Sequence, residues 1–136
     1  MSTTPKKKQS MPSITPTESF DSVRVFWLNR QAILEQLQES IQALTDQHPE
    51  IERVVLFGSL ARGDAVPGSD VDLLLIVRES TLPFLERSVQ YQLPHVGVGV
   101  DFFVYTQAEF KNMLEAGNTF IAQALREGIA LFNNRE

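Results

Sequence analysis

The sequence has no cysteine and only two histidines, His48 and His95. Without cysteine the chain cannot form disulfide bonds, thiolate zinc sites or a cysteine nucleophile. This composition fits a reducing compartment, and we therefore expect a cytoplasmic protein. Two histidines are also too few for a histidine-rich metal site. The sequence therefore directs the search for chemistry toward oxygen-bearing side chains.

Long apolar runs are missing too. No stretch approaches the roughly 20 apolar residues of a membrane helix, and no apolar segment follows the lysines at positions 6–8, as a secretory signal would require. Hydrophobic residues make up 43% and charged residues 21% of the 136 positions, which is typical of one globular domain. The net charge of −5 argues against a broad nucleic-acid-binding surface.

The pattern of side chains changes near residue 20. Residues 1–20 are rich in Ser, Thr, Pro and Lys and poor in apolar side chains, so we expect a flexible tail there. From Asp21 onward, apolar residues recur at steps of three and four, which predicts a helix that ends before Pro49. We expect a single folded domain over residues 21–136.

The rest of that domain reads as α/β (α+β), with a small mixed sheet and helices packed on one face. The runs that predict strands are residues 51–57, 70–77 and 98–105, with 129–132 as a short edge strand or a docking segment. The segments that predict helices are a short one beginning at Ser59 and two longer ones over 82–93 and 107–127, the last ended by Gly128.

Two carboxylates, Asp70 and Asp72, stand one residue apart where an apolar strand begins. Because side chains alternate along a strand, both point to the same face. Asp101 opens another apolar run, and a parallel neighbouring strand would bring its carboxylate beside them. Three such groups repel one another unless a hard cation lies between them. The pattern indicates a metal site, and a solvated strand entrance is the alternative interpretation.

A glycine–serine pair, Gly58 and Ser59, lies between the first strand and the short helix. Gly58 has no Cβ, so a polyanion can approach the main-chain N–H groups, and Ser59 adds a hydroxyl. Such a pair is also common without any ligand. Arg62, three residues after Ser59, can form a surface ion pair with Asp64.

Taken together, the order Gly58-Ser59, then Asp70-x-Asp72, then Asp101, within the run GSLARGDAVPGSDVDL, resembles the DNA polymerase β-like nucleotidyltransferase superfamily, and most closely its minimal nucleotidyltransferases. The resemblance covers residues 21–132. It implies a polymerase β-like core in which Gly58, Ser59 and Arg62 bind a nucleoside triphosphate. We expect this nucleotide to be ATP. The resemblance also implies that Asp70, Asp72 and Asp101 are catalytic and bind Mg²⁺, as two ions.

Small members of this superfamily often act with a separately encoded helical HEPN protein. The resemblance therefore implies an antitoxin that transfers AMP to a tyrosine of a HEPN toxin, within a hetero-oligomer and without membrane or direct nucleic-acid binding. Two alternatives stay open. One is a non-catalytic antitoxin that neutralises its partner by binding, and the other is a nucleotidyltransferase that modifies an antibiotic.

Residues around the third predicted strand allow further interpretations. Gly97 and Gly99 could permit close approach of the backbone, or they could lie in a flexible loop. Tyr105 has the parity of Asp101, although we favour a core position for it. His95 lies in a loop, where a contact with nucleotide or acceptor is the less favoured interpretation.

Overall fold

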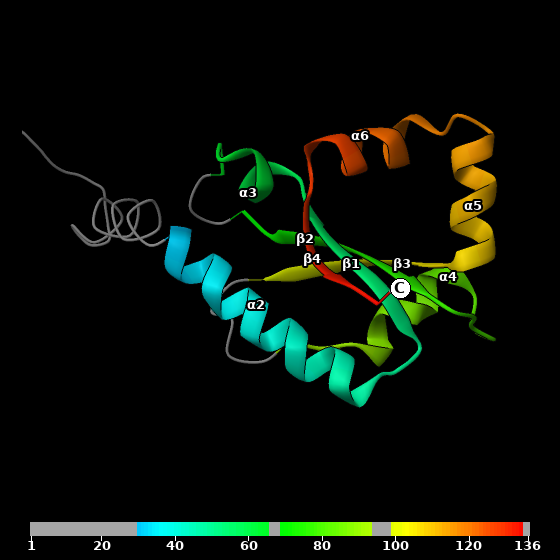
Figure 1. The fold of residues 1–136 in the computed structure, drawn as a ribbon, viewed down its shortest axis with the longest axis horizontal. Coiled ribbons are helices and arrows are strands. Elements are labelled where there is room, and N and C mark those ends of the chain that lie inside the picture. The colour runs from blue at the N-terminus through cyan, green and yellow to red at the C-terminus, as the bar shows by residue number, and fades with distance from the viewer. Residues whose placement is uncertain (1–29, 66–68, 94–98, 135–136) are drawn as a thin grey trace, which may run out of the picture. The chain divides into compact units, whose positions relative to one another are not determined.

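The computed structural model describes residues 30–65, 69–93 and 99–134 (Figure 1). Its elements in chain order are α2 (Arg30–Gln47), β1 (Ile51–Phe57), α3 (Ser59–Arg62), β2 (Val71–Val77), α4 (Phe84–Arg87), the 3-10 helix η1 (Ser88–Gln90), β3 (Val100–Thr106), α5 (Gln107–Glu115), α6 (Thr119–Glu127) and β4 (Ile129–Asn133). The expected tail, His95 and Gly97 lie outside the described residues. Within the described part, no helix is long and apolar enough to cross a bilayer.

The chain divides into two compact units, Met1–Leu34 with Val66–Gly68 and Glu35–Ala65 with Ser69–Glu136. The first turn of α2 is the only described part of the first unit. The sheet, the remainder of α2 and all other elements belong to the second unit.

Four strands form one mixed sheet in the order β3-β2-β1-β4. β1 is antiparallel to both β2 and β4, whereas β2 and β3 are parallel. This confirms the predicted mixed sheet. Residues 129–132, for which the sequence allowed an edge strand or a docking segment, form an edge strand. The other edge of the sheet is β3.

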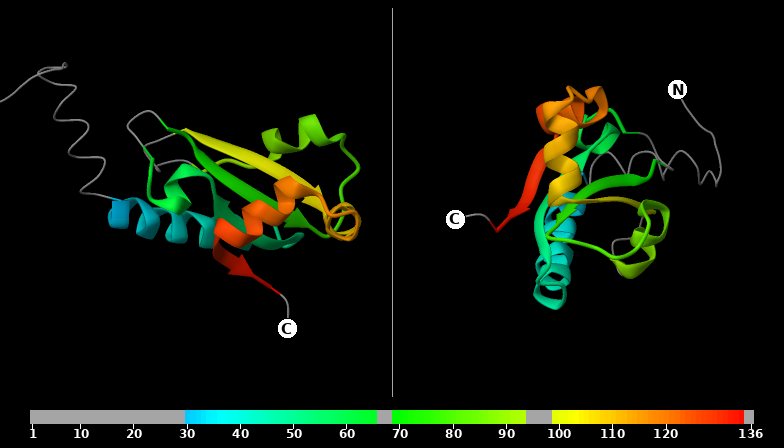
Figure 2. Two further views of the ribbon diagram at one scale, coloured as in Figure 1. Left: turned by 90° about the horizontal axis from the view of Figure 1, so that it is seen from above. Right: turned by 90° about the vertical axis from the view of Figure 1, so that its right-hand side faces the viewer.

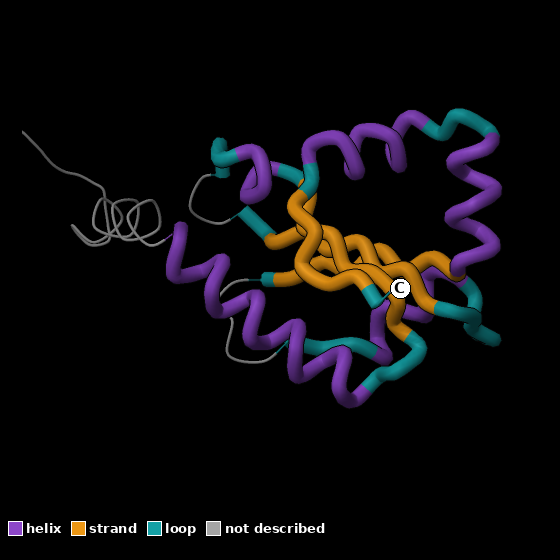
Figure 3. The backbone as a smooth tube through the Cα atoms, viewed as in Figure 1, coloured by secondary structure: helices purple, strands orange, loops and turns teal. Residues whose placement is uncertain are grey.

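Helices cover both faces of this sheet, which corrects the expectation of helices on one face (Figures 1 and 3). α5 and α6 pack on the face that carries Leu74 and Ile76, and α2 lies on the opposite face (Figure 2 gives two further views). The reason lies in β2, where every residue from Leu73 to Val77 is at most 2% exposed. A continuous apolar strand is typical of a sheet covered on both sides.

The C-terminal helical segment is two helices, where the sequence predicted one over residues 107–127. Gly117 adopts a left-handed φ of 74°, which ends α5. Asn118 then caps α6, since its side-chain oxygen accepts a hydrogen bond from the backbone N–H of Ile121 at 3.0 Å. The Gly–Asn pair is therefore the local signal that divides the segment.

The helix predicted over residues 82–93 is also shorter, with one turn in α4 followed by η1. Its Arg87 is buried, at 5% exposure, and forms two hydrogen bonds with Glu109 of 2.7 and 3.0 Å. Arg87 also donates to the carbonyls of Leu82 and Val104. These bonds attach α4 to β3 and α5, and this tertiary arrangement is not visible in the local sequence pattern.

Candidate active site

Asp72 and Asp101 lie side by side on neighbouring strands. β2 and β3 run parallel, and Asp72 is paired with Asp101 in their register. Because paired residues of adjacent strands project on the same face, the two carboxylates share one face of the sheet. Asp70 lies just before β2 with the parity of Asp72. The expectation that a parallel strand would bring Asp101 beside the first two acids is confirmed.

The glycine–serine turn meets the same end of β2. Phe57, the last residue of β1, is paired with Asp72, and Gly58 follows it directly. Gly58 has a φ of 80°, and a Cβ added to it would overlap the Oδ2 atom of Asp72. A side chain is excluded here both by the backbone conformation and by this close approach. Ser59 begins α3 immediately beyond the turn.

Gly99 makes equivalent room for Asp70. A Cβ on Gly99 would lie 2.5 Å from the Oδ1 atom of Asp70. The carbonyl of Gly99 accepts a hydrogen bond from the backbone N–H of Val71 at 2.8 Å, which fixes the start of the β2–β3 ladder. Of the two interpretations that the sequence left open for this glycine, close approach is correct. The two glycines thus leave room for the carboxylates of Asp72 and Asp70 to approach the backbone closely.

The carboxylates interact electrostatically. Burial of its carboxyl group raises the pKa of Asp72, the charges of Asp101 and Asp70 raise it further, and Arg62 opposes them. Among the described residues, no group of three acidic or histidine side chains forms a ready cage for a metal ion. Mg²⁺ commonly binds one or two carboxylates and completes its shell with water and phosphate oxygens. Asp70, Asp72 and Asp101 offer carboxylate oxygens of this kind, and the rest of a Mg²⁺ shell would have to come from water or phosphate oxygens.

Asp72→Asn is expected to stabilise the metal-free protein at neutral pH. Since the pKa of Asp72 is raised on folding, its charged form costs stability above the folded pKa, and this cost vanishes below the unfolded pKa. In EDTA the substitution should raise Tm by roughly 2–4 °C at neutral pH and have no effect below about pH 3. Asp46→Asn, at an exposed position of α2, is the control. A lower Tm for Asp72→Asn at neutral pH would contradict the inferred repulsion.

Arg62, at the end of α3, forms two ion pairs. Its Nε atom lies 3.2 Å from Asp64 Oδ2, and its Nη1 atom lies 3.4 Å from Glu127 Oε1 in α6. The ion pair with Asp64 was the sequence-based alternative to a phosphate contact, whereas nothing in the sequence indicated Glu127. The side chain remains 41% exposed, so a phosphate could compete for the guanidinium.

Three aromatic rings pack together beside the carboxylates, and sequence reasoning missed this group. Phe57 contacts Phe103 with ring centroids 5.3 Å apart and Phe120 with centroids 5.4 Å apart, and Phe103 and Phe120 are 5.8 Å apart. Phe57 adjoins Gly58, and Phe103 follows Asp101 by two residues. The rings thus attach α6 to the strand ends that carry the site. No spacing in the sequence connects Phe120 to the other two.

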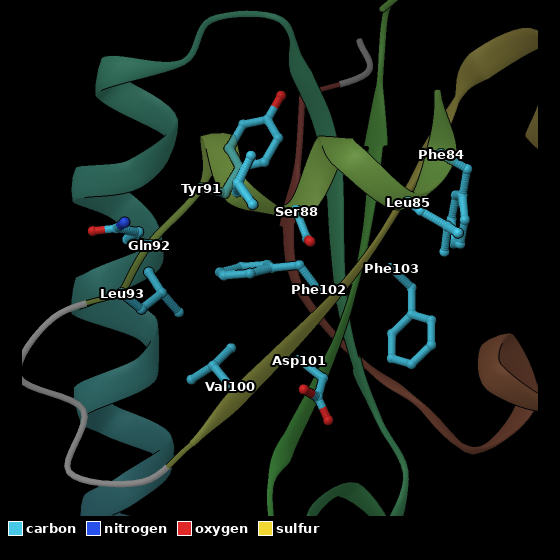
Figure 4. A pocket seen from close by; sticks show the side chains of 11 residues that line it. Phe84, Leu85, Ser88, Tyr91, Gln92, Leu93, Val100, Asp101, Phe102 and Phe103 are labelled. Carbon is cyan, nitrogen blue, oxygen red and sulfur yellow. The ribbon is translucent and has the colours of Figure 1, made fainter. Parts of the chain in front are cut away.

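Among the described residues, one cavity lies beside the Gly58 turn and a second is lined in part by Asp101. The first, of about 190 Å³, is lined by Gly58, Arg62 and Phe120 among others. A larger groove of about 570 Å³ lies beside β3, next to α4 and η1, and Asp101 is the one charged side chain among the described residues that line it (Figure 4). Tyr105 contributes to neither, because it packs against the core and stacks on Phe84. The core interpretation of Tyr105 is therefore confirmed.

Comparison with known proteins gives a family match. The model of the family described as polymerase beta, nucleotidyltransferase matches residues 39–136. No curated protein matches the sequence. One similar solved structure is a candidate nucleotidyltransferase from Sulfolobus solfataricus, with 22% identity and a TM-score of 0.48, covering 74% of this chain and 85% of that chain. Another is a toxin–antitoxin structure with AMP-PNP, with 20% identity and a TM-score of 0.49, covering 71% of this chain and 73% of that chain.

Proposed function

This chain belongs to the polymerase β nucleotidyltransferase family, and from that premise we propose that it transfers a nucleoside monophosphate, AMP from ATP, to an acceptor hydroxyl in a Mg²⁺-dependent reaction. The observation that carries the proposal is the pairing of Asp72 with Asp101, with the Gly58 turn packed against the Asp72 carboxylate. A polyphosphate held at the turn would lie directly beside the acidic cluster.

Each site residue has a separate role in this proposal. Gly58 and Ser59 bind the β and γ phosphates through backbone N–H groups and a hydroxyl. Asp70, Asp72 and Asp101 would hold Mg²⁺, as two ions, which would neutralise charge on the triphosphate and the leaving pyrophosphate. Asp101 also accepts the proton of the attacking hydroxyl. The acceptor oxygen bonds to the α-phosphorus as the bond to pyrophosphate breaks in line.

The proposed acceptor is a tyrosine of a HEPN toxin, for which this chain is the antitoxin in a hetero-oligomer. Support from the chain itself comes from Leu85 and Val89, which are 85% and 73% exposed and line the groove that contains Asp101. Large apolar side chains exposed next to a reactive carboxylate suit a protein acceptor better than a small solute.

Transfer of label from ATP tests this function. We expect the full chain, incubated with α-labelled ATP, Mg²⁺ and either a cell lysate or the product of the adjacent gene, to place label on a protein band. The double variant Asp70→Asn/Asp72→Asn should lose the labelling, because the phosphates are no longer held and neutralised. Asp46→Asn, which changes an exposed carboxylate of α2, should label like the wild type.

The outcome also separates the alternatives. If no protein is labelled and the double variant still neutralises its partner, the chain is a binding-only antitoxin and the transfer proposal fails. If label appears on an aminoglycoside or another small antibiotic and on no protein, the donor side stands and the proposed acceptor is wrong.

A further inference from the structure

Half of the backbone groups of the edge strand β3 face away from the sheet. In a parallel ladder, successive residues direct their N–H and C=O groups to alternate sides. The carbonyl of Gly99 accepts from Val71 in β2, so the odd-numbered residues of β3 face β2. The backbone groups of Val100, Phe102 and Val104 therefore face outward.

This outer edge is closed at one end and open at the other. Arg87 covers the end near α5, where its Nη1 atom donates to the carbonyl of Val104 at 3.1 Å. For Val100 and Phe102, the described part of the chain provides no hydrogen-bond partner on the outer side. Unpaired strand edges of this kind are templates for the addition of another strand.

The open part of the edge coincides with the 570 Å³ groove. Val100 and Phe102 point to one side of β3, toward Leu93 and Tyr91, whereas Phe103 points to the other side (Figure 4). Leu85 and Val89 are the two most exposed large hydrophobic residues of the described chain, and both line this groove. Large apolar side chains of a bound partner would cover Leu85, Val89 and the other apolar residues of the groove.

Alternation along β3 relates this groove to the reaction site. Val100 and Phe102 lie on one face, and Asp101 projects on the opposite face with Asp72. A segment added beside β3 would alternate in the same way, with every second side chain on the side of Val100 and Phe102 and the side chains between them on the side of Asp101, which the groove also reaches. One peptide could thus be anchored by apolar residues and present a hydroxyl to the carboxylates.

We propose that a partner polypeptide binds here as a fifth strand beside β3. Its backbone pairs with Val100 and Phe102, its alternate large apolar side chains fill the groove, and a hydroxyl-bearing residue between them reaches Asp101. The segment is neutral or basic, because the described residues that line the groove include no cation and the chain carries a net charge of −5. The presentation of the hydroxyl rests on the proposed transferase function, whereas the docking by strand addition does not require transfer.

Peptide selection tests the docking separately from transfer. The full chain is used to select from a library of peptides of about ten residues, randomised around a central tyrosine. We expect enrichment of large apolar residues at alternate positions. In the complex, NMR should show the amides of Val100 and Phe102 newly protected from exchange. N-methylation of the selected peptide at its pairing positions should weaken binding about tenfold, because each strand hydrogen bond is lost.

Exposed leucines provide a matched pair of variants. Leu85→Ser should weaken binding of the selected peptide about fivefold, whereas Leu114→Ser, on α5 outside the groove and 44% exposed, should not change it. Leu85→Ser should not lower Tm, since this side chain is 85% exposed, and neither substitution should alter the response to ATP.

Several results would overturn the proposal. Failure to enrich any alternating pattern would do so, as would equal loss of binding in both leucine variants. Protection of the Val100 and Phe102 amides in the free protein would show that the edge is covered by the chain's own residues, or by a second copy if protection grows with concentration. Transfer to a tyrosine without protection of these amides would also overturn the docking while leaving the proposed function intact. Peptide docking without transfer would support the docking and overturn the proposed function.

Discussion

Asp101→Asn is expected to lower the rate of AMP transfer by at least about 100-fold, because it removes the proposed base and one of the metal-binding carboxylates. The folded chain should persist, since Asp101 is exposed and asparagine preserves its shape. The substitution also removes one of the charges that raise the pKa of Asp72, so the variant should be at least as stable as the wild type in EDTA. Labelled-ATP kinetics and thermal melting measure the two effects.

The control for this prediction is Asp46→Asn, which makes the same chemical change at an exposed position of α2. It should leave the rate unchanged. Transfer by Asp101→Asn at the wild-type rate would exclude Asp101 from catalysis. A large loss of stability in this variant would mean that the carboxylate has a structural role instead.

Gly58→Ala is expected to disable the site by steric means. The added Cβ would overlap Asp72 Oδ2, and the φ of 80° is unfavourable for alanine. Displacement of the carboxylate and the turn from their alignment should cost transfer about 100-fold. Strain and collision together should lower the free energy of unfolding by about 1–3 kcal/mol.

Gly117→Ala separates strain from collision. Gly117 has a similar φ of 74°, but nothing lies within 4 Å of the position of its added Cβ. This variant should lose about 1 kcal/mol of stability and retain wild-type transfer. Equal losses of transfer in both variants would show that global destabilisation, and not the contact with Asp72, explains the effect of Gly58→Ala.

The strands were predictable because their signals are local. β1 has the predicted bounds, and β2 begins one residue after the predicted start. The parity of Asp70 and Asp72 required only the strand period. The position of Asp101 beside them required a parallel neighbour, which the sequence allowed and the register confirms.

Features that depend on tertiary contacts were not predictable. Arg87 is a charged residue in an exposed segment, and its hydrogen bonds to Glu109 and to the carbonyls of Leu82 and Val104 explain why it is buried. The ion pair between Arg62 and Glu127 was not predictable either, because the two residues are 65 positions apart in the sequence. The division between α5 and α6 is a different case, because Gly117 and Asn118 carried a local signal that the apolar periodicity obscured.

The central claim is that the acidic cluster and the Gly58 turn form one binding site for Mg²⁺ and ATP. Thermal melting of the full chain with and without Mg²⁺ and ATP tests it most directly. At about 100 times Kd, linkage predicts a stabilisation of about 2.7 kcal/mol for the wild type. The variant Asp70→Asn/Asp72→Asn should respond little. An equal rise in Tm for both proteins would contradict the assignment of the site.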